Sequence, residues 1–531
     1  MPAAARPAWR RAVAARLRMR SSDRGDIAIP NLLALPVRYP ALVLAAAQLG
    51  LHIWCNGHYG VFRDELYFIA CGWRPDWGYV DQPPLMPLIA ASSWHIFTGS
   101  LRGLRVVPAL AGAATVALTV RAAGELGGGL YARWLAGLCV MAAGVLQVFS
   151  VLLVTDTLQP LLWTALTLAL MPALSGRNGW WWGVGALAGL AFLTKYMVLF
   201  QVASLGLGIL AMPQRRVLGT HGPWLAALLA LAIAAPNLAW QAAHGFPFLE
   251  LGANAMAGKN IVLSPPAFLR EQVLSLNPVT APVWAAGLIA LLTQRAFAGL
   301  RWIALGWVAL MAMMLMIHAK PYYPAACYPM LMAAGAVALE AWLRPRPLRA
   351  AVVGTVIVGG VGLAPLFLPV LPVERFIAYQ HALGLEPSTG ENRALGTLPQ
   401  YYADMFGWHA LAAKVAQAYA ALPAQERAQA VFFAGNYGEA AAVEVLDAGT
   451  VPVISAHNNY FLWGPGRYDG SVVLLLARPD RVPIGKFDSC SPVGITNAAY
   501  AMPDETGKLL LVCRNRHRLP PVSWPALKHY D

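Results

Sequence analysis

The sequence predicts an α-helical polytopic membrane protein that carries a soluble α/β domain in its C-terminal part. Hydrophobic residues make up 58% of the 531 residues and charged residues only 12%, a composition far from that of an average soluble domain. Apolar runs long enough to cross about 30 Å of hydrocarbon recur from about Ala41 to Pro369 and then stop. The segment that follows, 371–531, has the mixed composition and the length of one soluble domain.

The first 38 residues are basic and precede every apolar run. They contain several arginines but no apolar core of the signal-peptide type, so we expect a basic cytoplasmic leader over 1–38. The formal net charge of the whole chain is +14. Because the basic residues fall in short clusters between apolar runs, and not on one face interleaved with aromatic residues, we expect no nucleic-acid partner.

Eleven membrane spans are expected within a transmembrane domain over 39–370. If the leader is cytoplasmic, arginines lie in every loop on that same side, which is the positive-inside pattern. An odd number of spans then places the soluble domain on the outer side. The expected spans are about 39–56, 104–123, 132–152, 157–173, 181–194, 197–213, 222–241, 279–294, 301–317, 324–343 and 350–369.

Acidic residues of the membrane part gather on the outer side. Asp64 and Glu65 are adjacent in the first outer loop, 57–103, at the start of a short stretch that suits a helix in the membrane interface. A helix cap would account for Asp64, but it leaves the second carboxylate unexplained. Asp81 follows in the same loop. Asp156, in the second outer loop, fits a helix cap and a functional site equally well.

Cationic and aromatic residues join the acids on this side. Lys195, in LTKYMVLF, either extends its ammonium group toward the outer headgroups or binds an anion. The run 316–329, MIHAKPYYPAACYP, brings His318 and Lys320 next to Tyr323. Anchoring at the membrane interface explains the tyrosine but not the histidine and lysine together. We therefore expect a phosphate-binding group here.

These residue types suit group transfer from a lipid phosphate. A carboxylate takes the proton of an attacking hydroxyl, and cations stabilise a departing phosphate, whose second pKa is near ~6. A polytopic lipid-linked-sugar transporter or flippase is the main alternative, and a non-enzymatic assembly protein is the third. Transporters usually show repeated halves and broken helices at the midplane, whereas this sequence has no visible internal repeat and its charges cluster on one side.

The residue types leave metal binding and disulfide formation open. Two neighbouring carboxylates are also suitable ligands for a divalent metal ion, and no ligand set is assigned. Cys490 with Cys513 is a candidate disulfide in an oxidising compartment, and Cys55 with Cys71 is a second. Buried free thiols are the alternative for both pairs.

The soluble domain is expected to alternate helices and strands. One helix is expected near Trp408–Leu422 and another after the turn 435–438, GNYG, which suits a plain strand-to-helix connection better than an anion site. The polar and aromatic run 455–466 suits a sugar contact and a structural loop equally. The expected strands are Ala430–Phe433, Val451–Ile454, Ser471–Leu476 and Leu509–Cys513.

Four motifs resemble a known family in order and in spacing. The family is that of the bacterial membrane glycosyltransferases of family 39, the dolichyl-phosphate-mannose protein mannosyltransferase group, to which the lipid A aminoarabinose transferase is related. The resemblance covers about Arg38 to Leu343 and is specific because four motifs occur together. The motifs are RDELYFIACGWRPDWGYVDQPPL, TDTLQPLLW, LTKYMVLF and HAKPYYPAACYP.

The resemblance implies a GT-C fold and transfer, with inversion, from a polyprenyl-phosphate-linked sugar to a lipid, glycan or protein acceptor. It implies a location in the bacterial cytoplasmic membrane, surrounded by membrane lipids, with the active site and the C-terminal domain in the periplasm. A divalent metal ion is the one cofactor that stays open. By position, the resemblance assigns Asp64 and Glu65 to catalysis as base and acceptor-orienting group, Asp156 to a second acidic site for acceptor or metal, and Lys195, His318, Lys320 and Tyr323 to the donor phosphate.

Overall fold

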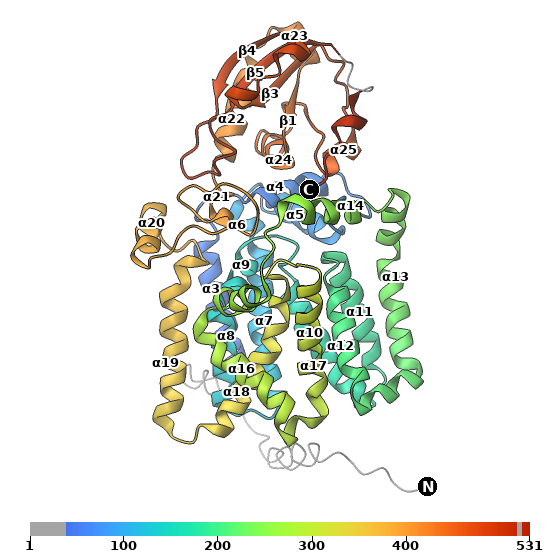
Figure 1. Cartoon of the computed structure of the whole chain (residues 1–531), viewed down its shortest axis with the longest axis vertical. Coiled ribbons are helices and arrows are strands. Elements are labelled where there is room, and N and C mark those ends of the chain that lie inside the picture. The colour runs from blue at the N-terminus through green and yellow to red at the C-terminus, as the bar shows by residue number, and fades with distance from the viewer. Residues whose placement is uncertain (1–38, 518–522) are drawn as a thin grey trace, which may run out of the picture.

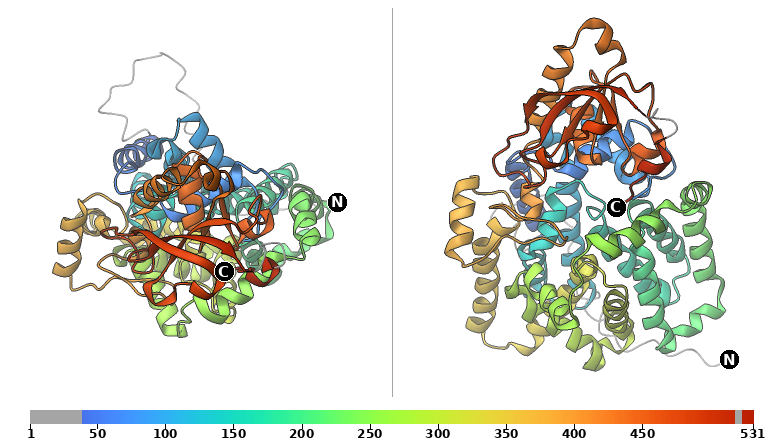
Figure 2. Two further views of the ribbon diagram at one scale, coloured as in Figure 1. Left: turned by 90° about the horizontal axis from the view of Figure 1, so that it is seen from above. Right: turned by 45° about the horizontal axis from the view of Figure 1, so that its top comes forward.

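The computed structural model describes residues 39–517 and 523–531, so the basic leader expected over 1–38 lies outside the described residues. Long helices form the lower part of the molecule, and a five-stranded sheet with its own helices forms the upper part (Figure 1). The two further views show the same arrangement, with the sheet over one end of the helix bundle (Figure 2).

Long segments rich in alanine, leucine and valine form the helices of the bundle. Apolar residues lie on most sides of these helices, as expected where lipid and other helices surround a segment whose backbone must bond internally. The bundle helices are α3 (Pro40–Cys55), α7 (Val106–Glu125), α8 (Leu130–Ala142), α9 (Gly144–Val151), α10 (Gln159–Leu174), α11 (Trp180–Thr194), α12 (Val198–Leu210), α13 (His221–Ala243), α16 (Ala281–Thr293), α17 (Arg301–Met316), α18 (Tyr328–Trp342) and α19 (Arg346–Leu363).

Several described helices are long and apolar enough to cross a membrane. Five meet this criterion alone, and up to eight do so if each of three bent pairs is counted as one span. One bent pair is α8 with α9, at 67°, within the expected span 132–152. Four further apolar helices, α3, α5 (Leu85–Ile96), α10 and α11, are shorter. The helical, multi-span character of the prediction is confirmed, and the count of eleven stays a prediction.

Glycines allow α16 and α18 to approach each other closely. A Cβ atom at Gly287 would collide with the Leu331 carbonyl, and one at Gly335 would collide with the Val283 carbonyl. Small residues at crossings are a common way to pack membrane helices, which have no hydrophobic driving force between them. The contact fixes the first half of α18, directly after the loop 317–327 that carries predicted donor-site residues.

Short helices and loops cover the end of the bundle that lies beneath the sheet (Figure 1). The first outer loop supplies α4, α5 and α6, and the chain that leaves the last bundle helix supplies α20 and α21. These short helices are α4 (Arg63–Gly72), α6 (Leu101–Leu104), α14 (Pro247–Asn254), α15 (Pro265–Ser275), α20 (Val373–Ala382) and α21 (Gln400–Ala403).

The sheet has the strand order β2-β1-β3-β5-β4. β1 pairs in parallel with β2 and β3, whereas β5 pairs antiparallel with β3 and β4. The four expected strands are present within a few residues, but β4 was not expected because FDSCSPVGI is largely polar and contains a proline. The elements are β1 (Val431–Ala434), β2 (Val453–Ser455), β3 (Val472–Ala477), β4 (Phe487–Ile495), β5 (Leu509–Arg516), α22 (Trp408–Ala420), α23 (Ala424–Gln429), α24 (Tyr437–Leu446) and α25 (Asn459–Trp463).

The sheet-containing part and the first outer loop share one hydrophobic core. Leu66 and Ile69 of α4 are buried in the same cluster as Phe432 of β1, Ala440 of α24 and Leu474 of β3. Burial of these apolar side chains is the main force that holds α24 against α4. The contact fixes the position of the helix whose first turn carries both predicted catalytic carboxylates.

One of the two candidate disulfides is present. Cys490 of β4 and Cys513 of β5 are bonded to each other. Cys55 and Cys71 are separate, buried free thiols. The second candidate pairing is therefore wrong, and the buried-thiol alternative holds for that pair.

Candidate functional site

Glu65 is fully buried at the start of α4 and serves the structure of the loop. Its Oε2 accepts the backbone N–H of Phe62 at 2.8 Å, which makes Phe62, and not Asp64, the residue that precedes the helix. Arg105 Nε and Nη2 donate to Oε1 and Oε2 at 2.9 and 2.8 Å. Leu153 N donates to Oε1 at 3.0 Å. With both oxygens occupied, Glu65 has no free lone pair aimed at a substrate or a metal ion.

Asp64 has a different environment, although it is the preceding residue. Its side chain is 32% exposed. Oδ1 accepts the phenol O–H of Tyr437 at 2.8 Å and lies 3.8 Å from Arg63 Nε. Oδ2 accepts no hydrogen bond from any residue of the described ranges. Asp64 is therefore an accessible carboxylate with one oxygen held and the other available.

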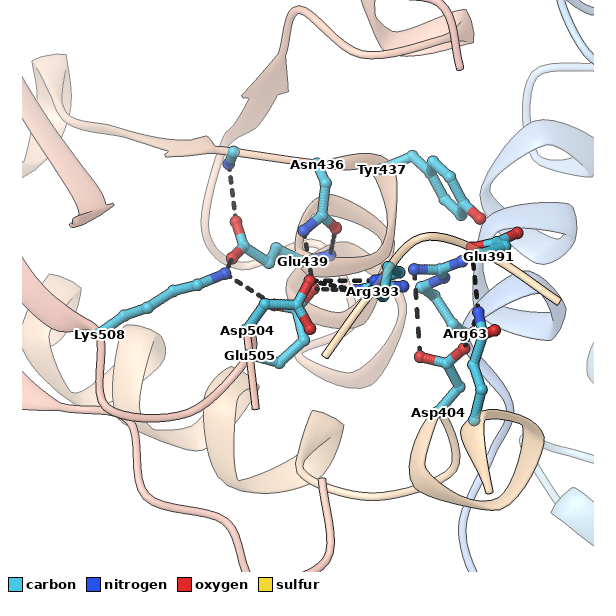
Figure 3. Close-up of polar contacts among 12 residues, drawn as sticks. Arg63, Glu391, Arg393, Asp404, Asn436, Tyr437, Glu439, Asp504, Glu505 and Lys508 are labelled. Atoms are coloured by element: carbon cyan, nitrogen blue, oxygen red, sulfur yellow. Dashed lines mark hydrogen bonds and ion pairs between the residues drawn. The ribbon is translucent and has the colours of Figure 1, made fainter. Parts of the chain in front are cut away.

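Arg63 connects the start of α4 to the C-terminal part of the chain. Its buried guanidinium lies 4.0 Å from Asp404 and 5.0 Å from the centre of the Tyr437 ring. Figure 3 shows this group, with Glu391 and Arg393 close by. Arg63 therefore places one positive charge between Asp64 and Asp404.

A second acid of the first loop lies near Asp64. Asp81 accepts a hydrogen bond from the phenol of Tyr67 at 3.1 Å. Burial raises the pKa of Asp81 to about 7, and the charge of Asp64 acts in the same direction. The two carboxyl groups are thus close enough to interact through their charges, and the half-buried Asp81 has a pKa near neutrality.

Three of the predicted site residues meet at the outer ends of the bundle helices. Lys195 Nζ lies 2.6 Å from Asp156 Oδ2 and 4.4 Å from the centre of the Tyr323 ring. It also lies 5.6 Å from the Tyr322 ring. This ammonium group is partly buried, with one carboxylate and two aromatic faces around it.

Lys320 pairs with a carboxylate that the sequence did not single out. Its Nζ lies 2.8 Å from Glu391 Oε1, and Gln400 donates to Glu391 Oε2 at 3.1 Å. Burial would raise the pKa of Glu391, but the charges of Lys320 and Lys259 outweigh it and lower this pKa to about 2. The site thus contains one buried carboxylate under the charges of two half-buried lysines.

The two clusters belong to one region around Tyr322. Burial raises the pKa of Tyr322 well above its ordinary value, and the charges of Asp156, Glu391 and Asp64 raise it further. All three carboxylates are thus close enough to act on one phenol. Asp64, Asp156, Lys195, Lys320 and Tyr323 are brought together.

His318 is the one predicted donor-site residue that stands apart. Its backbone has a positive φ of 49°, and its side chain is exposed. Within the described ranges, its side chain takes part in no hydrogen bond or ion pair. Its role at the phosphate stays a prediction.

The closest arrangement to a metal-ligand set in the described residues is His457, His529 and Asp531, with three ligand atoms within 4.8 Å of one another. Nδ1 of His457 faces the N–H of Tyr437 at 3.4 Å, which leaves the ring proton on Nε2. Nε2 lies 2.7 Å from Asp531 Oδ1. Because a metal ion would need the lone pair where this ring carries its proton, the group fits a His–Asp–His hydrogen-bonded cluster better.

Sequence reasoning missed five residues that build the site. Two had a signal, because Arg63 directly precedes the acidic pair and Arg105 lies at the start of the expected span 104–123, directly after the first outer loop. The others come from distant segments, and only the tertiary fold brings them to the site. The five residues are Arg63, Arg105, Lys259, Glu391 and Tyr437.

Comparison with known proteins gives a family match and a fold match. Residues 81–240 match the family described as dolichyl-phosphate-mannose-protein mannosyltransferase. ArnT from Cupriavidus metallidurans bound to undecaprenyl phosphate has a TM-score of 0.59 and 16% identity, over 91% of this chain and 98% of that chain. Its apo state gives 0.57 and 15%, over 90% and 97%.

The oligosaccharyltransferase of Archaeoglobus fulgidus, tethered to an acceptor peptide, gives a TM-score of 0.45 and 13% identity, over 79% of this chain and 64% of that chain. No curated protein matches the chain by sequence. The family match includes Asp81, Asp156 and Lys195, and the ArnT likeness extends over nearly the whole of both chains. These findings agree with the resemblance drawn from the four motifs: residues 81–240 match the mannosyltransferase family, and the chain has the fold of ArnT.

Proposed function

We propose that the protein transfers a sugar from a polyprenyl-phosphate donor to a hydroxyl acceptor, with inversion, on the outer face of the cytoplasmic membrane. One observation carries the proposal. Asp64 is an accessible carboxylate with a free Oδ2, and its charge acts on Lys320 and on Tyr322, whose ring lies 5.6 Å from the ammonium group of Lys195. That combination supplies a base for the attacking hydroxyl and cations for the departing phosphate.

The proposed reaction is a single displacement at the anomeric carbon. The acceptor hydroxyl gives its proton to Oδ2 of Asp64 while its oxygen forms the new bond to the anomeric carbon. The bond between that carbon and the phosphate oxygen breaks, and its electron pair leaves with the lipid phosphate. Attack from the face opposite the leaving group inverts the configuration.

Lys195 and Lys320 are the proposed clamp for the phosphate. Each ammonium group has three N–H donors, so pairing with Asp156 or Glu391 leaves donors for phosphate oxygens. The rings of Tyr322 and Tyr323 lie against the Lys195 ammonium group and limit its hydration. A clamp that is already desolvated and oriented stabilises charge more strongly than mobile water does.

The likeness to ArnT bound to undecaprenyl phosphate supports a donor of the polyprenyl-phosphate class. The archaeal oligosaccharyltransferase is tethered to an acceptor peptide, but its TM-score of 0.45 is too low for an argument about this chain. We therefore define the acceptor by its chemistry alone, as a hydroxyl group on a lipid, a glycan or a protein that reaches the outer membrane surface.

Mass spectrometry of envelope lipids, glycans and proteins tests the proposal, because it detects a glycosylated product whichever sugar is transferred. Cells that lack the gene are complemented with the wild type, with Asp64→Asn or with Asp480→Asn. Asp480 is a matched control because it is an exposed aspartate, with 71% of its side chain accessible, in the sheet-containing part. A glycosylated product restored by the wild type and Asp480→Asn, but not by Asp64→Asn, is expected. Restoration by all three would refute the assignment of Asp64.

A further inference from the structure

We propose that Tyr437, which belongs to the sheet-containing part of the chain, is a positioning residue for Asp64, so that transfer depends on α24 being docked on α4. The inference rests on the proposed function, in which Asp64 is the base. It assigns a role in the reaction to the C-terminal part. The four sequence motifs lie in the membrane domain and do not extend into that part.

The geometry of the contact is specific. The Tyr437 O–H donates to Asp64 Oδ1 at 2.8 Å across 373 residues of sequence. The phenol ring is 6% exposed and lies 4.7 Å from the Tyr67 ring and 5.0 Å from the His457 ring, measured between ring centres. The Arg63 guanidinium covers the ring at 5.0 Å. With neighbours on these sides, the phenol has one accessible orientation.

A network of polar side chains fixes the first turn of α24, where Tyr437 lies (Figure 3). Asn436 caps the helix, because its Oδ1 accepts the Glu439 N–H at 2.9 Å, and its Nδ2 donates to Glu505 at 2.9 Å. Lys508 Nζ lies 2.5 Å from Glu439 Oε1 and 2.8 Å from Glu505 Oε2. The network fixes the backbone next to Tyr437, so that the hydroxyl of Tyr437 is held at Asp64.

The hydrogen bond orients the proposed base. It holds Oδ1 of Asp64, which directs Oδ2 to the acceptor. A misplacement of about 1 Å can lower the rate by about 10²-fold.

Tyr437→Phe tests the inference, with Tyr460→Phe as the matched control. Tyr460 is also a buried tyrosine of this part, but its hydroxyl donates to Glu444 at 2.5 Å and does not contact Asp64. Initial rates are measured at neutral pH in washed membranes that contain the endogenous donor, with the product quantified by mass spectrometry. Thermal unfolding in detergent checks that both variants fold.

We expect Tyr437→Phe to lower the rate at neutral pH by about 10- to 100-fold, the usual effect of losing a hydrogen bond to a charged group. Binding of undecaprenyl phosphate, measured on the purified variant, should stay within about 2-fold of the wild type, because Tyr437 contacts Asp64 and not the proposed phosphate clamp. Tyr460→Phe should stay within about 2-fold of the wild type in both measurements.

Two results would overturn the inference. One is a folded Tyr437→Phe variant with a wild-type rate, and the other is an equal loss of rate in both tyrosine variants. Asp64→Asn in the same membranes separates this failure from failure of the proposed function. If Asp64→Asn is inactive while Tyr437→Phe is normal, only the proposed role of Tyr437 is refuted. If Asp64→Asn is active, the proposed function, with Asp64 as the base, is refuted.

Discussion

At the residue scale, two adjacent carboxylates have separate tasks because successive helix residues point about 100° apart. Glu65 faces the protein interior and forms a bidentate pair with Arg105, with both side chains at 0% exposure. Asp64 faces the region shared with Lys320 and Asp156. Adjacency in the sequence drew attention to this loop, but only one of the two residues has a free oxygen.

Glu65→Gln should destabilise the protein by about 3–5 kcal/mol, because it leaves the Arg105 charge buried without its partner. The control is Glu125→Gln, which breaks an exposed pair with Arg121 and should cost less than about 1 kcal/mol. Thermal unfolding in detergent measures both. A fully stable but inactive Glu65→Gln variant would contradict the structural role and would indicate that Glu65 takes part in catalysis.

The ionisation of Asp81 should lower the free energy of unfolding of the protein as pH rises toward neutrality. Its pKa of about 7 in the folded protein exceeds the ordinary value of about 3.9 in an unfolded chain. The folded state therefore binds the proton more tightly, and this stabilisation is complete below about pH 4 and is lost as pH rises through 7.

Asp81→Asn removes the ionisation but keeps the oxygen that accepts the Tyr67 hydrogen bond. The unfolding temperature of the variant, relative to the wild type, should therefore rise between pH 5 and pH 8. The measurement is a series of melting curves of both proteins in detergent. A constant difference across this range would show that Asp81 titrates well below neutrality.

At the element scale, α24 is the helix that joins the two parts of the molecule, and its cap is accessible to a test. Asn436→Ala should cost about 1 kcal/mol of stability through the lost cap and should also slow transfer, because Tyr437 is the next residue. Asn436→Ser keeps a capping oxygen and should recover most of the stability. Melting curves and initial rates of the two variants check this. Equal behaviour of alanine and serine would contradict the importance of the cap.

Sequence patterns predicted most elements whose character is set locally. Long apolar runs predicted the bundle, and the strands β1, β2, β3 and β5 follow from short apolar stretches between turns. β4 was not predicted, because an exposed edge strand lacks such an apolar stretch. The bends between bundle helices were not predicted either, since a single apolar run contains no signal for the 67° bend between α8 and α9.

The candidate site was predictable to the extent that it lies in the motifs. Asp64, Asp156, Lys195, Lys320 and Tyr323 all lie in motifs, and the fold brings them together. Glu391 and Tyr437 were not predictable, because each meets its partner only after the C-terminal part docks on the bundle. Their own sequence surroundings, a loop and a strand-to-helix turn, carry no functional signal.

At the scale of the whole molecule, the expected orientation in the membrane puts the site and the sheet outside. Single cysteines at exposed positions test it in intact cells: Ser388→Cys and Asp469→Cys should react with an impermeant thiol reagent, and Gly219→Cys should not. Cys55, Cys71 and Cys139 are buried in the wild type, and the half-buried Cys327 is replaced by serine to keep background labelling low. Labelling at Gly219 alone would invert the orientation and contradict an outer active site.

The central claim is that Asp64 accepts the proton of the acceptor hydroxyl. The most direct measurement is single-turnover transfer from a polyprenyl-phosphate-linked sugar by purified Asp64→Asn, with donor binding measured on the same preparation. The amide keeps the shape of the side chain but lacks the basicity, so transfer should fall by about 10²–10⁴-fold while donor binding and folding persist. Transfer at the wild-type rate by a folded, donor-binding Asp64→Asn variant would contradict the account.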